Sequence, residues 1–394
     1  MTSGAARGPQ LLRLVHAGPG LTRAEAAHAL GAGTGTTTEV VTRLVAEQLL
    51  QEGAPTSGGR RGRPTRPLTA HPQGPLVLAA VVSHESWRLQ AVQLGGTAVA
   101  AAGGHHDGTD PARVLAAVRA AALRTARRFP GRVRGCGLAV PGLVTDGHRL
   151  HAPLLGWSGV DLRRAWPREL LDGGGPGTGP GAGRGIDDEL LVAGNDARLA
   201  AVGESARGAA VGARAALHLH LDAGLGGALT AGGVLVDGAR GSAGEFGHLP
   251  FGDPGVACGC GASGCWGTAL DGAALARALG EPVPRDPVAS SHRVLDRAAA
   301  GEAGAGAAVR GVAAALGRGA AGLVNALDAD LVTLGGLGVR VADVAGDVLQ
   351  ESYRAGLMAF RRADPPPVRA AALGEDGPLT GAAELVWSRL WARC

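Results

Sequence analysis

The sequence of 394 residues contains no lysine, a single tyrosine and only five cysteines. No apolar run approaches the roughly 20 residues of a membrane-spanning helix, so we expect no membrane partner. Residues 1–20 lack the basic segment, apolar core and cleavage site of a secretory signal, which argues against a secreted protein. With 45% hydrophobic and 18% charged residues the chain is globular rather than disordered, and its length suits two or three domains.

Because lysine is absent, all 38 positive side chains besides histidine are arginine, and their distribution is uneven. Residues 1–70 hold eight arginines against four acids, whereas the other residues hold 30 of each sign. The whole net charge of +4 therefore belongs to the N-terminal segment. This distribution predicts a small nucleic-acid-binding domain in front of a neutral body.

Three of the five cysteines lie within eight residues, at Cys258, Cys260 and Cys265, and His248 precedes them. An odd cysteine count without a secretory signal favours a reducing, cytoplasmic location and metal ligation over disulfides. Three thiolates and one imidazole form a complete tetrahedral set for Zn²⁺, which leaves no open position for a catalytic water. We predict a structural zinc site at these four residues; the alternative is that they are incidental free side chains.

The N-terminal segment has the pattern of a helix-turn-helix. A short apolar helix after Pro9 is followed by a capping box at Thr22 and Glu25, then by a glycine break and a second box at Thr36 and Glu39. The helix that follows the second box is the candidate for the DNA major groove. Its candidate DNA contacts are Thr36, Thr37, Thr38 and Arg43.

A basic, glycine-containing stretch follows at residues 58–66, with Arg60, Arg61 and Arg63 at its centre. Glycine lets the backbone approach a groove closely, and arginine suits phosphates or a narrow minor groove. We interpret the stretch as the wing of a winged helix-turn-helix. The alternative is a solvated linker between domains, because arginine runs are common there.

From residue 76 onward, apolar strand-like runs alternate with alanine-rich helical stretches, which indicates an α/β architecture. The expected strands are 76–82, 89–94, 135–140, 190–192, 215–221 and 331–334, and the expected helices are 112–129, 197–206, 273–279, 307–328 and 379–391. Residues 172–185 are almost all glycine and proline, and we expect a loop there.

Two motifs at predicted strand ends have more than one interpretation. Asn195 and Asp196 can hold a polyol, or Asp196 can act as a general base in phosphoryl transfer, but an aspartate there can equally cap the next helix. The glycine-rich residues 222–227 can approach phosphates, although a hairpin turn is the commoner structure for one glycine cluster.

Taken together and in order, these motifs resemble the ROK family of repressors, open reading frames and sugar kinases. The matching segments are Pro141-Gly142 with Gly156-Trp157, Asn195-Asp196-Ala197 with Gly203-Glu204, Glu245 to His248 with the three cysteines, and Leu334-Gly335-Gly336. The resemblance covers nearly the whole chain. It implies a two-lobed, actin-like (ribonuclease H-like) α/β sugar-kinase fold with an N-terminal winged helix-turn-helix. Domains at 1–72 and 73–394 are expected, with Asn195, Asp196, Glu245 and His248 in a sugar site.

Two departures from the family pattern bear on function. The D-x-G-G-T of family kinases, whose glycines meet ATP phosphates, aligns here with Val81 to Glu85, where side chains would block the phosphates. In sugar-binding members a glutamate stands two residues after the last cysteine, where this chain has Gly267. The first departure predicts that the protein is not an enzyme, and the second predicts a weakened sugar site.

We therefore expect a transcriptional regulator, most simply a repressor, that binds a pseudo-palindromic operator in double-stranded DNA and responds to a sugar or sugar derivative. A homodimer or homotetramer is implied, because one winged helix buries too little surface for tight operator binding. The alternatives are an ATP-dependent sugar kinase and an effector-independent DNA-binding dimer.

Overall fold

The computed structural model describes residues 4–55, 65–108, 110–172, 185–239 and 241–393. The chain divides into two compact units, which are described separately below. Unit 1 comprises residues 1–195 and 382–394, and unit 2 comprises residues 196–381. The expected loop at 172–185 lies almost wholly outside the described residues. The expected boundary at residues 72 and 73 falls inside unit 1, between β2 and β3, and remains a prediction.

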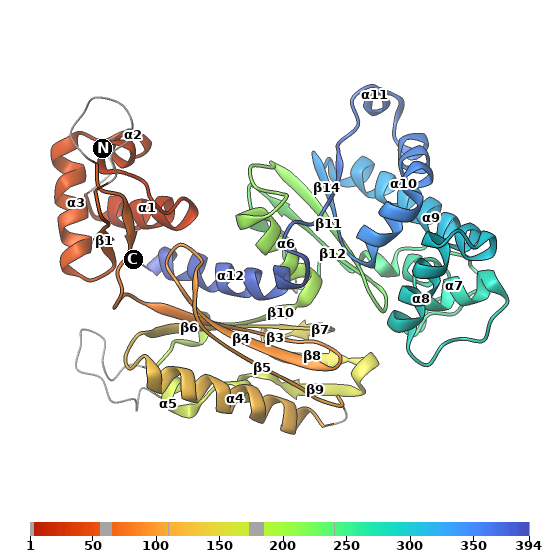
Figure 1. Cartoon of the computed structure of the whole chain (residues 1–394), viewed down its shortest axis with the longest axis horizontal. Coiled ribbons are helices and arrows are strands. Elements are labelled where there is room, and N and C mark those ends of the chain that lie inside the picture. The colour runs from red at the N-terminus through yellow and green to blue at the C-terminus, as the bar shows by residue number, and fades with distance from the viewer. Residues whose placement is uncertain (1–3, 56–64, 109, 173–184, 240, 394) are drawn as a thin grey trace. The chain divides into compact units, whose positions relative to one another are not determined.

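Unit 1 begins with three helices and a pair of short strands (Figure 1). The elements are α1 (Gly4–Ala17), α2 (Arg23–Ala29), α3 (Thr34–Ala46), β1 (Leu50–Glu52) and β2 (Leu68–Ala70), and β1 pairs with β2 antiparallel. Apolar residues three or four apart on the helices build a small core with both strands: Leu11, Val15, Ala26, Val41, Leu44, Leu50 and Leu68 are fully buried or nearly so. We refer to these five elements as the helix-turn-helix region.

The remainder of unit 1 is a five-stranded sheet in the order β10-β6-β3-β4-β5. The strands are β3 (Leu76–Val82), β4 (Ser86–Gln93), β5 (Ala98–His105), β6 (Val133–Val140) and β10 (Leu191–Asn195). A smaller sheet of β7 (Leu143–Thr145), β8 (Arg149–Ala152) and β9 (Trp157–Asp161) adjoins it, and α5 (Arg168–Leu171) follows in the chain. Helices α4 (Pro111–Arg128) and α12 (Gly377–Arg393) lie on opposite faces of the larger sheet (Figure 1).

Alternation along β6 explains how its two faces are covered. Cys136, Leu138 and Val140 point into the apolar cluster that α4 completes. Gly135 and Gly137 point the other way, where a Cβ would meet Val386 and Ala382 of α12. Glycine at these two positions therefore allows the helix to lie directly on the strand.

Unit 2 repeats the sheet pattern of unit 1, with three antiparallel strands followed by two parallel ones, in the order β13-β12-β11-β14-β15. The strands are β11 (Ala215–Leu221), β12 (Leu225–Ala231), β13 (Val234–Leu235), β14 (Leu331–Gly336) and β15 (Val368–Ala370). The helices are α6 (Asp196–Arg207), α7 (Gly272–Leu279), α8 (Pro287–Ala299), α9 (Ala303–Leu327), α10 (Leu337–Gly356) and α11 (Ala359–Arg362).

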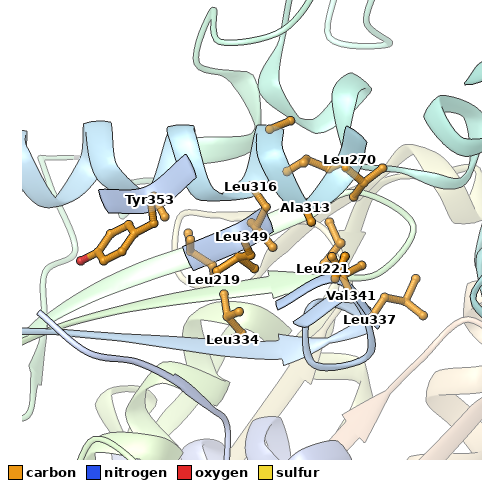
Figure 2. Close-up of a cluster of buried hydrophobic side chains, with 14 of the residues drawn as sticks. Leu219, Leu221, Leu270, Ala313, Leu316, Leu334, Leu337, Val341, Leu349 and Tyr353 are labelled. Atoms are coloured by element: carbon orange, nitrogen blue, oxygen red, sulfur yellow. The ribbon is translucent and has the colours of Figure 1, made fainter. Parts of the chain in front are cut away.

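The core of unit 2 lies between its sheet and the pair α9 and α10. Figure 2 shows Leu219, Leu221 and Leu334 of the strands below Leu316 of α9 and Leu349 of α10. Helix α9 has the length and apolarity of a membrane span, which the sequence analysis did not anticipate, but 61% of its apolar window is buried inside this core. Such burial is typical of a core helix in a globular unit.

Candidate functional site

The capping box at Thr22 and Glu25 is confirmed at the start of α2, with Thr22 and Glu25 exchanging hydrogen bonds. The box predicted at Thr36 and Glu39 is wrong. Helix α3 begins three residues earlier than that box implies, at Thr34, with Gly33 as the N-cap. The hydroxyl of Thr37 instead donates to the carbonyl of Gly33, one helical turn back.

The earlier start of α3 separates the four residues predicted to contact DNA. Thr37 is 1% exposed and faces the core of the helix-turn-helix region, whereas Thr36 is half-buried and Thr38 and Arg43 are exposed. The guanidinium of Arg43 lies 3.9 Å from the Glu47 carboxylate, with both side chains about half exposed. The open face of α3 thus presents Thr38 and Arg43, while Thr37 serves packing.

Strands β1 and β2 form the base of a hairpin at the predicted wing, with Leu50 opposite Ala70 and Glu52 opposite Leu68. Arg23 of α2 donates to Glu52 of β1 at 2.7 Å, which ties the hairpin to the helices. The wing residues Arg60, Arg61 and Arg63 lie outside the described residues. Their contact with DNA stays a prediction.

The four predicted metal ligands come together in unit 2, with His248 Nδ1 or Nε2 and the sulfurs of Cys258, Cys260 and Cys265 all within 4.8 Å of one another. Cys258 Sγ lies 3.7 Å from His248 Nδ1, and Cys260 Sγ lies 3.6 Å from Cys265 Sγ. Tetrahedral zinc with Zn–S bonds of about 2.3 Å requires sulfurs about 3.8 Å apart. The donor set and its spacing therefore fit a four-coordinate ion.

The local backbone explains this spacing. A tight turn closes between Cys258 and Gly261, and the amide of Cys258 donates to Ala262. Gly261 and Gly264 have φ angles of +94° and +75°, which only glycine adopts without strain. Burial raises the pKa of the Cys265 thiol to about 12, whereas the backbone of Ala262 and the two other thiols lower the pKa of Cys260. A bound cation would favour the thiolate form of Cys265 against the effect of its burial.

His248 links this cluster to the predicted sugar site. Its Nδ1 faces Cys258, and its Nε2 lies 3.8 Å from Glu245 Oε2. Both side chains are 48% exposed, so their outer atoms are open to a ligand. A metal held by Nδ1 would fix the ring and leave the Nε2 proton for Glu245 or a ligand oxygen.

Asn195 and Asp196 lie where β10 meets α6, and the division between the two units passes between them. The Asn195 amide donates to the carbonyl of Gly142 at 3.2 Å. Asp196 is the first residue of α6 and not its N-cap, and one of its oxygens accepts from the amide of Ala197 at 2.8 Å. Both side chains are half-buried, which leaves part of each accessible.

The glycine-rich motif at 222–227 is a hairpin, as its commoner interpretation predicted. The turn is Asp222 to Gly224, and Gly226 and Gly227 belong to β12. A Cβ on Gly226 would meet Ala197 of α6, and one on Gly227 would meet Phe246. These two glycines therefore let the start of α6 and the Glu245 segment pack closely on the strand.

Gly267 lies beside the same segment. A Cβ built there would be 3.3 Å from the carbonyl oxygen of Gly247 and 3.7 Å from the amide of Leu225. The first contact is tight, so a side chain at residue 267 requires the Gly247 carbonyl to move by a few tenths of an ångström.

Two buried charged residues near the site have structural partners. Glu204 is 1% exposed and accepts from the amides of Ala209, Ala372 and Leu373, which explains the Gly-Glu of the motif without a ligand. Arg198, which the sequence analysis missed, is 8% exposed and donates to Asp237 and to the Gly241 carbonyl. The local sequence does not indicate the role of Arg198, because its partners lie about forty residues further along the chain.

Comparison with known proteins agrees with these motifs. The ROK family domain matches residues 189–389. A glucokinase from Halalkalibacterium halodurans is 31% identical over 270 residues, which are 64% of this chain and 76% of that protein. An N-acetylmannosamine kinase from Yersinia pestis is 35% identical over 172 residues, or 43% of this chain, and the match spans about half of that kinase, 54% of its length.

Solved structures share the fold. A ROK family transcriptional regulator, a homolog of the E. coli MLC protein, superposes with a TM-score of 0.75 over 99% of this chain and 97% of its own, at 18% identity. The ROK hexokinase from Thermus thermophilus gives a TM-score of 0.63 at 28% identity, over 80% of this chain and 99% of its own. The predicted two-lobed sugar-kinase fold is confirmed, and the chain belongs to the ROK family.

Proposed function

We propose that this protein is a DNA-binding transcriptional regulator, most simply a repressor, whose body responds to a sugar or sugar derivative. The observation that carries the proposal is the N-terminal arrangement of three helices and one antiparallel strand pair, which is that of winged helix-turn-helix DNA-binding domains. The similarity to a regulator over 99% of the chain, against 80% for the hexokinase, supports it.

In this proposal α3 enters the major groove of double-stranded DNA. Thr36, Thr38 and Arg43 would face base edges or phosphates, and Arg60, Arg61 and Arg63 of the wing would hold the backbone or minor groove. One such region buries too little surface for tight operator binding, so a homodimer or homotetramer on a pseudo-palindromic operator follows.

The body would hold a sugar through hydroxyl contacts. Carboxylates of Asp196 and Glu245 accept hydrogen bonds, the Asn195 amide offers a donor, and His248 Nε2 offers another. His248, Cys258, Cys260 and Cys265 would hold one structural zinc ion, which fixes the His248 ring and the 248–265 loop. Thiolate ligation suits a cytoplasmic, reducing location.

Several observations support a protein without kinase activity. The β3–β4 hairpin closes where the phosphate loop would be, with the Ser83 amide donating to the Ser86 carbonyl at 2.8 Å. Val81 is 5% exposed and offers no carboxylate, while Glu85 is exposed and would repel ATP phosphates.

A test of the proposal is binding of the full-length protein to duplexes from its own upstream region, followed by titration with glucose, N-acetylmannosamine and other hexoses and amino sugars. We expect saturable DNA binding that one sugar shifts. If no sugar changes the DNA binding, the protein has no sugar effector, and an effector-independent DNA-binding dimer is supported instead.

A sugar kinase is the second candidate, favoured by the relatives named glucokinase and by Asp196 at the start of α6. An assay of ADP release with glucose and ATP discriminates between the two. Turnover that Asp196→Asn abolishes would establish the kinase, because that change removes a general base while keeping side-chain size.

A further inference from the structure

Helix α1 of the helix-turn-helix region ends against α12, and a buried histidine lies at the contact. His16 is 5% exposed, and its Nε2 lies 2.9 Å from Glu384 Oε2 of α12. Glu384 is 9% exposed. The contact joins residues 368 positions apart in the chain, so it is tertiary and not part of the local helix structure.

The second ring nitrogen of His16 is also used. Its Nδ1 accepts from the backbone amide of Gly95 at 3.0 Å, in the turn between β4 and β5. Because an amide N–H can only donate, Nδ1 carries no proton, and Nε2–H donates to Glu384. One imidazole therefore joins α1 to two separate elements of the body.

Two tryptophans of α12 complete the contact. Trp387 and Trp391 are stacked with ring centroids 5.0 Å apart, and the His16 ring lies 5.4 Å from the first and 5.7 Å from the second. Both indoles are at least nine-tenths buried. We call His16, Gly95, Glu384, Trp387 and Trp391 the α1 dock.

The α1 dock has the properties of a positioning site and not of a general apolar contact. Two directional hydrogen bonds with a defined tautomer fix the orientation of α1, whereas apolar burial alone would allow sliding. Leu11 and Val15, five residues and one residue before His16 on α1, are fully buried in the core that α1 forms with α3. Orienting α1 therefore orients the helix proposed to read DNA.

We propose that His16 is a positioning residue for DNA binding, which holds the helix-turn-helix region on α12 in the orientation that the operator requires. The inference rests on the proposed function. Without the dock, the region would sample other orientations, and the apparent affinity for DNA would fall with the competent fraction.

The test compares His16→Ala, His16→Gln and Ser388→Ala in the full-length protein. Gln places an amide nitrogen near Nε2 and so keeps the Glu384 bond, whereas Ala removes both bonds. Ser388 is exposed on α12 beside Trp387 and serves as the matched control. The measurements are hydrogen exchange of amides in α1 and α3 and the Kd for an upstream duplex that the unchanged protein binds.

For His16→Ala we expect faster exchange over residues 14–17, unchanged protection of Val41 and Leu44 in α3, and a Kd weakened by about tenfold, the equivalent of one charged hydrogen bond. His16→Gln should recover most of the affinity, and Ser388→Ala should match the unchanged protein.

Three results would overturn the proposal. Exchange in α1 unaffected by His16→Ala would mean that the dock does not hold the helix. Faster α1 exchange with an unchanged Kd would mean that docking does not matter for DNA. Loss of α3 protection as well would reduce His16 to a role in folding. If the unchanged protein binds no duplex, the proposed function itself is refuted. That outcome is distinguished from the other three because it is seen before any variant is tested.

Discussion

Gly267 is the position in the proposed sugar site where the family glutamate is absent. A Cβ there would lie 3.3 Å from the Gly247 carbonyl oxygen, so a side chain requires a shift of a few tenths of an ångström beside the Glu245 and His248 segment. A hydrogen bond accepted by a charged group contributes about 1.5–3 kcal/mol. The proposed function therefore predicts that the missing carboxylate weakens sugar binding.

Replacing Gly267 with Glu should therefore tighten glucose binding by about 10- to 100-fold, because the new carboxylate accepts from a sugar hydroxyl. Calorimetric titration of the zinc-loaded protein measures the change. Gly267→Ala is the matched control, since it adds the Cβ without the carboxylate. Equal affinities of the Glu and Ala variants would show that the position does not contact the sugar.

His218 makes the stability of unit 2 depend on pH. Its ring is 2% exposed, Nδ1 lies 2.9 Å from Thr333 Oγ1, and burial, followed by the neighbouring His220, lowers its pKa to about 3. The unfolded chain binds a proton at a pKa of about 6.5, while the folded protein stays neutral. This histidine therefore leaves the free energy of unfolding unchanged above about pH 6.5. Below that value the free energy of unfolding falls, because the unfolded chain gains a proton that the folded protein does not bind.

The free energy of unfolding should fall by about 2 kcal/mol more between pH 7 and pH 5 in the natural protein than in His218→Gln. Urea unfolding at several pH values measures the difference. His292→Gln, which changes an exposed histidine of the same unit, should keep the natural pH dependence. If the free energy of unfolding depends on pH in the same way in the natural protein and in His218→Gln, His218 is not the source of the pH dependence.

At the scale of elements, most of the apolar runs were predictable, whereas helices α8 and α10 were missed. Strands β3 and β11 have the predicted bounds, and the predicted α4, α6, α7, α9 and α12 differ by a few residues at their ends. Helix α10 was missed, since it follows Gly335-Gly336, contains Gly338 and Gly346, and is kinked at Ala345. Its stability comes from packing on α9 and the sheet, which local sequence does not report.

The clustering of His248 with the three cysteines was predictable from their spacing, because four residues within eighteen positions can be brought together in few ways. The α1 dock was not, because His16 and Glu384 are joined only by the tertiary structure. Thr37 shows a further limit: its residue type suggested a DNA contact, but the helix starts three residues earlier than predicted and its side chain points inward. The position of a residue around the helix axis decides whether its side chain is exposed, and that position depends on where the helix begins.

Cys260→Ser should weaken zinc binding by more than about 100-fold, because one of four ligands is lost. Metal content after dialysis and protease cleavage of the loop measure the effect, and we expect cleavage within residues 247–267. Ser263→Ala, at an exposed position of the same loop, is the control. Stoichiometric zinc retained by Cys260→Ser would exclude this residue as a ligand.

The predicted wing can be tested through the salt dependence of DNA binding. Replacing Arg61 and Arg63 with Ala should lower the slope of log Kd against log salt by about 2, because each phosphate contact releases counterions. Arg285 and Arg318, both exposed in unit 2, provide a control pair of equal charge. A slope unchanged in the Arg61 and Arg63 variant would identify the stretch as a linker.

At the scale of the whole molecule, a cationic N-terminal region precedes a sugar-kinase fold in which Val81 to Glu85 differ from the D-x-G-G-T of family kinases. The charge excess of residues 1–70 coincides with the helix-turn-helix region, whereas residues 71–394 hold equal numbers of arginines and acidic residues. Such a division is expected when one part binds a polyanion and the other binds a neutral ligand or another copy of the chain.

The most direct measurement is a fluorescence-anisotropy titration of the purified protein against duplexes from its own upstream region at low ionic strength, with ADP release from glucose and ATP followed in the same preparation. The account predicts saturable binding to one duplex that weakens steeply with salt, and no sugar-dependent ADP release. Absence of binding to every duplex together with phosphorylation of a hexose would contradict it.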